Sequence, residues 1–149
     1  ILGSDQGRNV YKKKLVNLVE RYNLNKKIKF VPHCKEMPIA YSLSDVVVSA
    51  SIEPEAFGRI SVEAQSMGKP IIASNIGGSK ETIINKKTGL LYKYDDPREL
   101  AKNLNTVIQL SVDELKSMGN EGRKNITKKF DVEIMCQSNL KEYKRLIKN

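Results

Sequence analysis

Short apolar runs alternate with segments of helical periodicity along most of this chain. Residues 45–50 (Asp-Val-Val-Val-Ser-Ala) and 70–74 (Pro-Ile-Ile-Ala-Ser) have the length and composition of buried parallel strands, and Ile1 and Leu2 resemble the end of another strand. Residues 9–22 repeat apolar side chains at helical spacing, and residues 37–43 form a shorter helical segment. Alternating strands and helices predict an α/β fold, a Rossmann-like doubly wound parallel sheet.

Three helix starts follow in the second half of the chain. Asp96 and Glu99 have the spacing of an N-cap and its third helical residue, and Ser111 and Glu114 repeat this capping-box pattern. Asp131 is placed to cap the last helix. We therefore predict three C-terminal helices after the sheet.

The segment between the two apolar runs carries the most specific chemistry. Glu55 and Glu63 are eight positions apart, with Phe57 and Gly58 between them. In a βαβ unit, ligands bind where the carboxyl ends of strands meet the amino ends of helices. A helix that starts near Gly58 would present free N–H groups to a phosphate, with Glu63 roughly 7–8 Å along its axis.

Two carboxylates beside an anion site suit a phosphate flanked by polyhydroxylated rings, because carboxylates accept hydrogen bonds from hydroxyls. The spacing alone leaves a second interpretation open. In that interpretation Glu63 is a solvated helix residue and Glu55 interacts only with the helix dipole. Ser61 could likewise donate to the phosphate or be an ordinary serine of the helix surface.

The run Glu55–Ala64 resembles the Glu-x7-Glu motif of group 1 glycosyltransferases, which are retaining enzymes of the GT-B fold. The resemblance covers nearly the whole chain in family order. It includes a Gly-rich turn, the next strand with its base-contacting end, a tyrosine helix with the central strand, a Gly-Gly-x-x-Glu loop and a Thr-Gly-Leu-Leu hairpin, here residues 2–5, 28–33, 41–48, 77–81 and 88–92.

This resemblance implies that residues 1–149 are the C-terminal, nucleotide-sugar-binding half of a GT-B fold with extra C-terminal helices. The half would be truncated at its N-terminal edge, and the acceptor domain would be absent. The family's upstream Arg-Lys pair, which meets the diphosphate, would be absent as well. The isolated chain would then be inactive, and its first partner would be the N-terminal acceptor domain of the same enzyme.

The resemblance also implies roles for the motif residues. Glu55 would lie against the donor sugar as the catalytic residue, and Glu63 would bind the ribose hydroxyls. Backbone amides of Phe57, Gly58 and Arg59 would meet the sugar and phosphate. Arg59 replaces the family's usual aliphatic residue, so only its backbone role is carried over.

Other contacts of the donor are implied in the first third of the chain and in the Gly-Gly loop. Gly3 could hold the backbone close to the diphosphate, although a turn explains a glycine equally well. Pro32 stands where the family has a glycine near the nucleobase, and His33 could contact the base or simply be polar surface. The pair Gly77–Gly78 either precedes a second anion-binding helix start or forms a plain tight turn.

The implied activity is transfer of a hexose, with retention, from a nucleoside diphosphate sugar to a glycan or lipid-linked acceptor. The setting would be bacterial cell-envelope polysaccharide or lipopolysaccharide biosynthesis. The nucleotide sugar is a substrate, and no cofactor is expected. The chain lacks the Asp-x-Asp pair of metal-dependent GT-A enzymes, so metal independence is expected. Alternative functions are a sugar-nucleotide epimerase, a glycogen-synthase-like enzyme, or a non-catalytic module that docks on a separate partner half.

Composition narrows the possible partners. The net charge is +9, but aromatic residues are only 6% of the chain and do not alternate with the lysine clusters, which argues against nucleic-acid binding. A basic surface could still favour peripheral contact with an anionic membrane. With one histidine and two distant cysteines, the chain offers no zinc pattern. Unpaired thiols fit the cytoplasm, where the enzyme could work at the inner face of the cytoplasmic membrane.

Overall fold

The computed structural model describes residues 1–3, 7 and 9–147. It divides into two compact units, Ile1–Ala40 and Tyr41–Asn149. The organisation of the chain as one donor-binding domain stays a prediction.

Within its described residues, the first unit contains the predicted long helix and an isolated strand bridge. Helix α1 spans Asn9–Arg21, within the range expected from its periodicity, and Val19 is its buried residue. Leu2 and Val31 form an isolated parallel bridge, in which the Val31 N–H donates to the Ile1 carbonyl over 2.8 Å. Helix α2, Met37–Ser42, runs from this unit into the next.

The second unit is built on a parallel sheet of strands β1 (Val47–Ser49), β2 (Ile71–Ser74) and β3 (Gly89–Tyr92), in that order. All four residues of the central strand β2 are buried. Two of the strands are the apolar runs predicted from the sequence. The predicted hairpin at residues 88–92 is wrong, because β3 pairs in parallel with β2, with Gly89 opposite Ile71.

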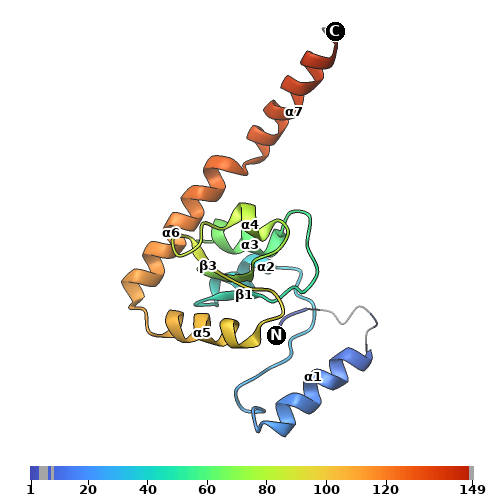
Figure 1. Ribbon diagram of the computed structural model, residues 1–149, viewed down its shortest axis with the longest axis vertical. Coiled ribbons are helices and arrows are strands. Elements are labelled where there is room, and N and C mark those ends of the chain that lie inside the picture. The colour runs from blue at the N-terminus through green and yellow to red at the C-terminus, as the bar shows by residue number, and fades with distance from the viewer. Residues whose placement is uncertain (4–6, 8, 148–149) are drawn as a thin grey trace. The chain divides into compact units, whose positions relative to one another are not determined.

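Helices cover both faces of this sheet, which confirms the doubly wound α/β arrangement. Helix α3 (Arg59–Ser66) and the short helix α4 (Ser79–Thr82) lie on one side, and α5 (Pro97–Ile108) lies on the other (Figure 1). The core on the α5 side is a cluster of side chains from β2, β3 and α5, namely Ile72, Leu90, Tyr92 and Val107.

Helix α6 (Val112–Lys129) packs closely on α3 through two buried glycines. A Cβ at Gly119 would lie 1.9 Å from the Gly68 carbonyl oxygen, and one at Gly122 would lie 3.0 Å from Gln65 Cγ. Because neither position has a side chain, the backbone of α6 can pack directly against α3. This contact holds α3 in position.

A buried amide is part of a hydrogen-bond network that joins three helices. The fully buried Gln65 of α3 donates from Nε2 to the carbonyls of Ser61 and Thr82, each over 3.0 Å. Asn125 of α6 donates to the same Thr82 carbonyl over 3.0 Å. Thr82 ends α4, so these bonds hold α3, α4 and α6 in one arrangement.

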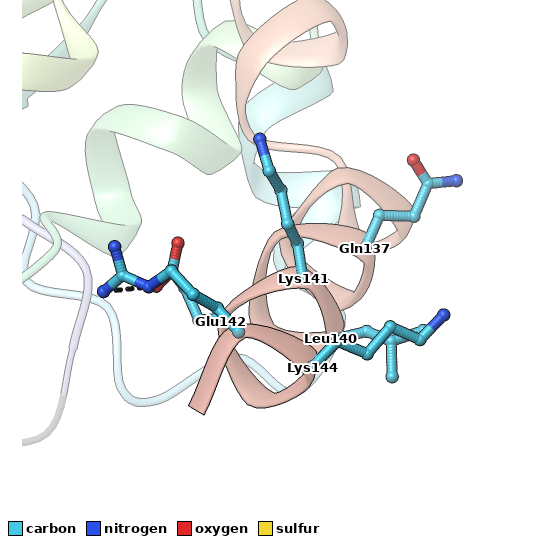
Figure 2. A pocket seen from close by; sticks show the side chains of 6 residues that line it. Gln137, Leu140, Lys141, Glu142 and Lys144 are labelled. Carbon is cyan, nitrogen blue, oxygen red and sulfur yellow. Dashed lines mark ion pairs between the residues drawn. The ribbon is translucent and has the colours of Figure 1, made fainter. Parts of the chain in front are cut away.

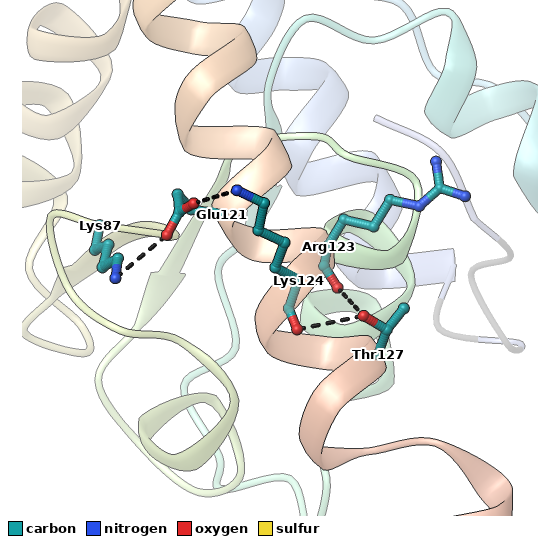
Figure 3. A network of polar contacts seen from close by, with 5 residues as sticks. All are labelled: Lys87, Glu121, Arg123, Lys124 and Thr127. Carbon is teal, nitrogen blue, oxygen red and sulfur yellow. Dashed lines mark hydrogen bonds and ion pairs between the residues drawn. The ribbon is translucent and has the colours of Figure 1, made fainter.

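Glu121 links α6 to the loop before β3 at the surface. Its carboxylate lies 3.0 Å from Lys124 Nζ and 3.2 Å from Lys87 Nζ (Figure 3). The two lysines, Lys124 foremost, hold the pKa of Glu121 below its ordinary value. Exposed ion pairs of this kind contribute little to stability. The position of α6 therefore depends on the contacts of its glycines with α3 and the residues that follow it.

The predicted caps of the C-terminal helices are confirmed. Asp96 accepts from the backbone N–H groups of the first turn of α5, and Ser111 and Glu114 form a full capping box at the start of α6. Asp131 Oδ1 accepts from the Glu133 N–H over 2.9 Å at the start of α7, Val132–Ile147. None of the described residues of α7 is buried.

We expect Gly119→Ala to lower the free energy of unfolding by about 1–3 kcal/mol, because the new methyl group meets the Gly68 carbonyl. In a helix without close packing at this position, the same change would stabilise the protein by roughly 1 kcal/mol. A loss of stability would therefore indicate that the Gly68 carbonyl lies close to Gly119. Urea unfolding measures it. Asn120→Ala, an exposed neighbour on α6, is the control, and equal stability of both variants would contradict the packing argument.

Candidate functional site

The site lies where β1 ends and α3 begins, within the second unit. Glu55 stands in the loop after β1, and Glu63 stands inside α3. The helix begins at Arg59 with Gly58 as its N-cap, which confirms the predicted helix start near Gly58. The motif therefore has one carboxylate before the helix and one within it, on either side of the helix amino end.

Gly58 is required here by both conformation and space. Its φ is 72°, in the left-handed region that favours glycine, and a Cβ would lie 3.3 Å from the backbone nitrogen of Ser79. Among the described residues no side chain caps α3 at this position. The Ser61 N–H donates to the Gly58 carbonyl over 3.0 Å, so the N–H groups of Arg59 and Ile60 are the ones that can serve an external anion.

The Gly77–Gly78 loop packs directly against the motif loop. The Gly78 N–H donates to the Glu55 carbonyl over 2.8 Å. A Cβ at Gly77 would lie 2.4 Å from the Glu55 carbonyl oxygen, and one at Gly78 would lie 2.3 Å from the carbonyl carbon of Phe57. Backbone packing thus accounts for both glycines without a ligand.

Each motif carboxylate accepts a hydrogen bond from a hydroxyl. Ser51 Oγ donates to Glu55 Oε1 over 2.6 Å, and Ser74 at the end of β2 donates to the Ser51 carbonyl over 2.7 Å. Tyr41 Oη donates to Glu63 Oε2 over 2.8 Å. The sequence predicts no role for Ser51 or Tyr41. The family's tyrosine helix, which begins at Tyr41, is the one signal that could have indicated a role for that residue.

Tyr41 is a permanent donor in this pair. Its side chain is 5% exposed, and burial, together with the hydrogen bond to Glu63, raises the pKa of Tyr41 well above its ordinary value. The phenol therefore stays protonated, and one oxygen of the half-buried Glu63 carboxylate is fixed toward α2. The interpretation of Glu63 as a fully solvated helix residue does not fit this contact.

Three other predicted residues lie around the start of α3. Phe57 is 46% exposed and meets Phe130 edge to face, with ring centroids 5.8 Å apart. Arg59 is exposed at the first helical position. Ser61 is only 1% exposed and lies 3.4 Å from Ser79 Oγ, so it is not a serine of the helix surface, and its contact with a phosphate stays a prediction.

The remaining predicted residues belong to the first unit. The Gly3 N–H donates to the Val31 carbonyl over 3.1 Å, and Pro32 and His33 are exposed directly after Val31. The structure therefore brings together Glu55, Phe57, Gly58, Arg59, Ser61 and Glu63. The donor contacts of Gly3, Pro32 and His33 stay predictions.

The hollow beside α7 is a different feature (Figure 2). Its lining residues all come from α7, and they include the ion pair of Arg145 and Glu142 at 2.9 Å but no motif residue. Across residues 1–3, 7 and 9–147, no three His, Cys, Asp or Glu side chains gather as metal ligands, and no helix has the length and apolar character needed to cross a bilayer.

Comparison with known proteins identifies the family. The family model for glycosyl transferases group 1 matches residues 1–125. The chain belongs to this family. Among curated relatives it is 30% identical to spore coat protein SA of Bacillus subtilis over 74% of this chain, and 27% identical over 83% of this chain to the capsular polysaccharide biosynthesis glycosyltransferase CapM of Staphylococcus aureus.

Solved structures of glycosyltransferases share the fold. A glycosyltransferase from Rickettsia africae is 33% identical with a TM-score of 0.92 over 99% of this chain. Anabaena HepE, solved in complex with UDP and glucose, is 28% identical with a TM-score of 0.89 over 97% of this chain. These similarities confirm the predicted half of a GT-B fold. The chain spans 29% and 32% of the two curated relatives and 39% of each of these solved chains.

We expect Gly58→Val to weaken binding of UDP far more than binding of uridine, because a branched side chain at the start of α3 blocks a diphosphate. Gly68→Val is a matched control, since Gly68 has a φ of 68° near the other end of α3 with open space around it. Both variants should lose about 1–2 kcal/mol of stability from backbone strain. Calorimetry measures the affinities, and equal loss of UDP affinity in the two variants would contradict the anion site.

Proposed function

We propose that this chain is the C-terminal, donor-binding domain of a retaining glycosyltransferase. The enzyme transfers a hexose from a nucleoside diphosphate sugar to a glycan or lipid-linked acceptor. The observation that supports this most is the placement of Glu55 and Glu63 on either side of the uncapped amino end of α3. That arrangement offers hydrogen-bond acceptors for two hydroxylated rings and N–H donors for the phosphates between them.

The diphosphate, the ribose and the transferred sugar each have a matching group in this proposal. The N–H groups of Arg59 and Ile60, at the start of α3, offset the charge of the diphosphate. Glu63 accepts hydrogen bonds from the ribose hydroxyls, and Glu55 accepts from the sugar that is transferred. Because positive charge develops on that sugar in the transition state, a carboxylate beside it stabilises the transition state more than the ground state.

The transfer breaks the bond between the anomeric carbon and the diphosphate oxygen and forms one to the acceptor oxygen. The departing phosphate takes the proton of the acceptor hydroxyl, and both events on one face of the sugar retain its configuration. Charge on the leaving group is met by helix N–H groups and basic side chains, so neither a metal ion nor a cofactor enters the proposal.

UDP is the first nucleotide to test, since HepE was solved with UDP and glucose. Neither the family match nor the site geometry favours a sugar-nucleotide epimerase, a glycogen-synthase-like enzyme or a silent binding module, so transfer is the activity proposed. The proposed setting is synthesis of a bacterial envelope polysaccharide, since the relative CapM is a capsular polysaccharide biosynthesis glycosyltransferase.

The proposal places the acceptor site on another domain of the same enzyme, since this chain spans about a third of its curated relatives. It places the enzyme in the cytoplasm at the inner face of the membrane. The free thiols Cys34 and Cys136 suit a reducing compartment, and the net charge of +9 suits an anionic surface.

Glu63→Ala should weaken UDP binding by about 1–3 kcal/mol, the range for removing a charged hydrogen-bond partner. Calorimetry on the full-length protein measures the loss. Glu133→Ala, which removes an exposed carboxylate on α7, should leave the affinity unchanged. An unchanged affinity in folded Glu63→Ala would remove the ribose contact from the proposal.

Glu55→Ala should lower kcat about 100-fold or more in the full-length enzyme while UDP affinity stays within about twofold, because its contact strengthens in the transition state. Steady-state transfer assays and calorimetry separate the two quantities. Glu53→Ala changes an exposed carboxylate in the same loop and should keep normal turnover. Full activity of Glu55→Ala would exclude it as a catalytic residue.

A further inference from the structure

The hydrogen bond between Tyr41 and Glu63 joins two elements that are far apart in the sequence. Tyr41 lies on α2, and Glu63 lies 22 residues later in the middle of α3. Their 2.8 Å contact is partly buried, and the phenol itself is almost fully buried. A buried hydroxyl needs a partner, and here the partner is the carboxylate that the proposed function assigns to the ribose.

The end of α2 that carries Tyr41 is itself held in place. The Ser44 hydroxyl donates to the Tyr41 carbonyl over 2.8 Å, and the Ser44 N–H donates to it over 3.1 Å. Lys69 Nζ, in the loop between α3 and β2, donates to the Ser42 carbonyl over 2.9 Å. The phenol therefore approaches Glu63 from a backbone whose last two α2 carbonyls, those of Tyr41 and Ser42, are both hydrogen-bonded.

The geometry determines what Glu63 can still do. Its Oε2 accepts from the phenol, which leaves Oε1 and the other lone pair of Oε2 for external donors. The carboxylate is thus oriented before any ligand binds. Such preorganisation lowers the entropy lost on binding.

We propose that Tyr41 is a positioning residue for the donor, which acts through Glu63 to aim its free carboxylate oxygen at the ribose hydroxyls. The inference rests on the proposed function, since it needs Glu63 to bind the ribose. It goes further by assigning a role to a residue that touches no part of the donor. Without the phenol, Glu63 loses its fixed orientation.

The test uses Tyr41→Phe in the full-length protein, which removes one oxygen and keeps the ring. The Kd for UDP should rise roughly 5- to 10-fold, because a carboxylate that is not held in place must be ordered on binding. The KM for the nucleotide sugar should rise in parallel, with kcat nearly unchanged. Tyr92→Phe is the control, because it removes a buried hydroxyl that faces Ser74 and should leave UDP affinity unaltered.

Two further measurements separate positioning from a general loss of structure. Wild type and Tyr41→Phe should bind 2′,3′-dideoxyuridine diphosphate equally, since it lacks the hydroxyls that Glu63 would accept from. In a Glu63→Ala background, Tyr41→Phe should have no additional effect on UDP affinity.

Equal weakening of UDP and its dideoxy analogue would overturn the inference, as would an unchanged UDP affinity in Tyr41→Phe. If Glu63→Ala weakens UDP binding and Tyr41→Phe does not, only this inference fails. If Glu63→Ala binds UDP normally, the ribose assignment in the proposed function fails, and this inference fails with it.

Discussion

The motif loop is shaped by a backbone contact that only glycine permits. The Gly78 N–H donates to the Glu55 carbonyl over 2.8 Å, and a Cβ on Gly77 or Gly78 would lie within 2.4 Å of the backbone of the motif loop. Real Cβ atoms do not approach that closely, so any side chain here would push the loop away from α4. The start of α3 and the position of Glu55 depend on this approach.

Glycines also allow close backbone packing between α6 and α3. Gly119 and Gly122 bring α6 against the far end of α3, and Gln65 is then enclosed, with its Nε2 donating to carbonyls of α3 and α4. A buried amide with directed hydrogen bonds permits fewer arrangements than apolar packing does. Contacts at both ends therefore hold α3 in place, and no side chain of the described residues caps its first turn.

The two carboxylates are held by different means, in keeping with the different roles proposed for them. Glu63 accepts from a buried phenol that cannot ionise near neutral pH, so its orientation is rigid. Glu55 accepts from the Ser51 hydroxyl in an exposed loop. A rigid acceptor suits recognition of a nucleotide, and a carboxylate in the open loop suits a group that meets a sugar and a second substrate.

Local patterns in the sequence determined the elements themselves. Apolar runs predicted β1 and β2, capping residues predicted the starts of α5, α6 and α7, and the Glu-x7-Glu spacing predicted a carboxylate on either side of the start of α3. The hairpin at residues 88–92 failed because strand direction depends on a distant partner, here β2.

Only the tertiary structure decided which side chains meet across elements. It paired Tyr41 with Glu63 and buried Ser61, and it explained Gly77 and Gly78 by packing. Periodicity and capping act within one or two turns and can be read from neighbouring residues. Contacts between residues 17 to 43 positions apart, such as those of Gln65 and Asn125 with Thr82, arise only when whole helices pack on the sheet.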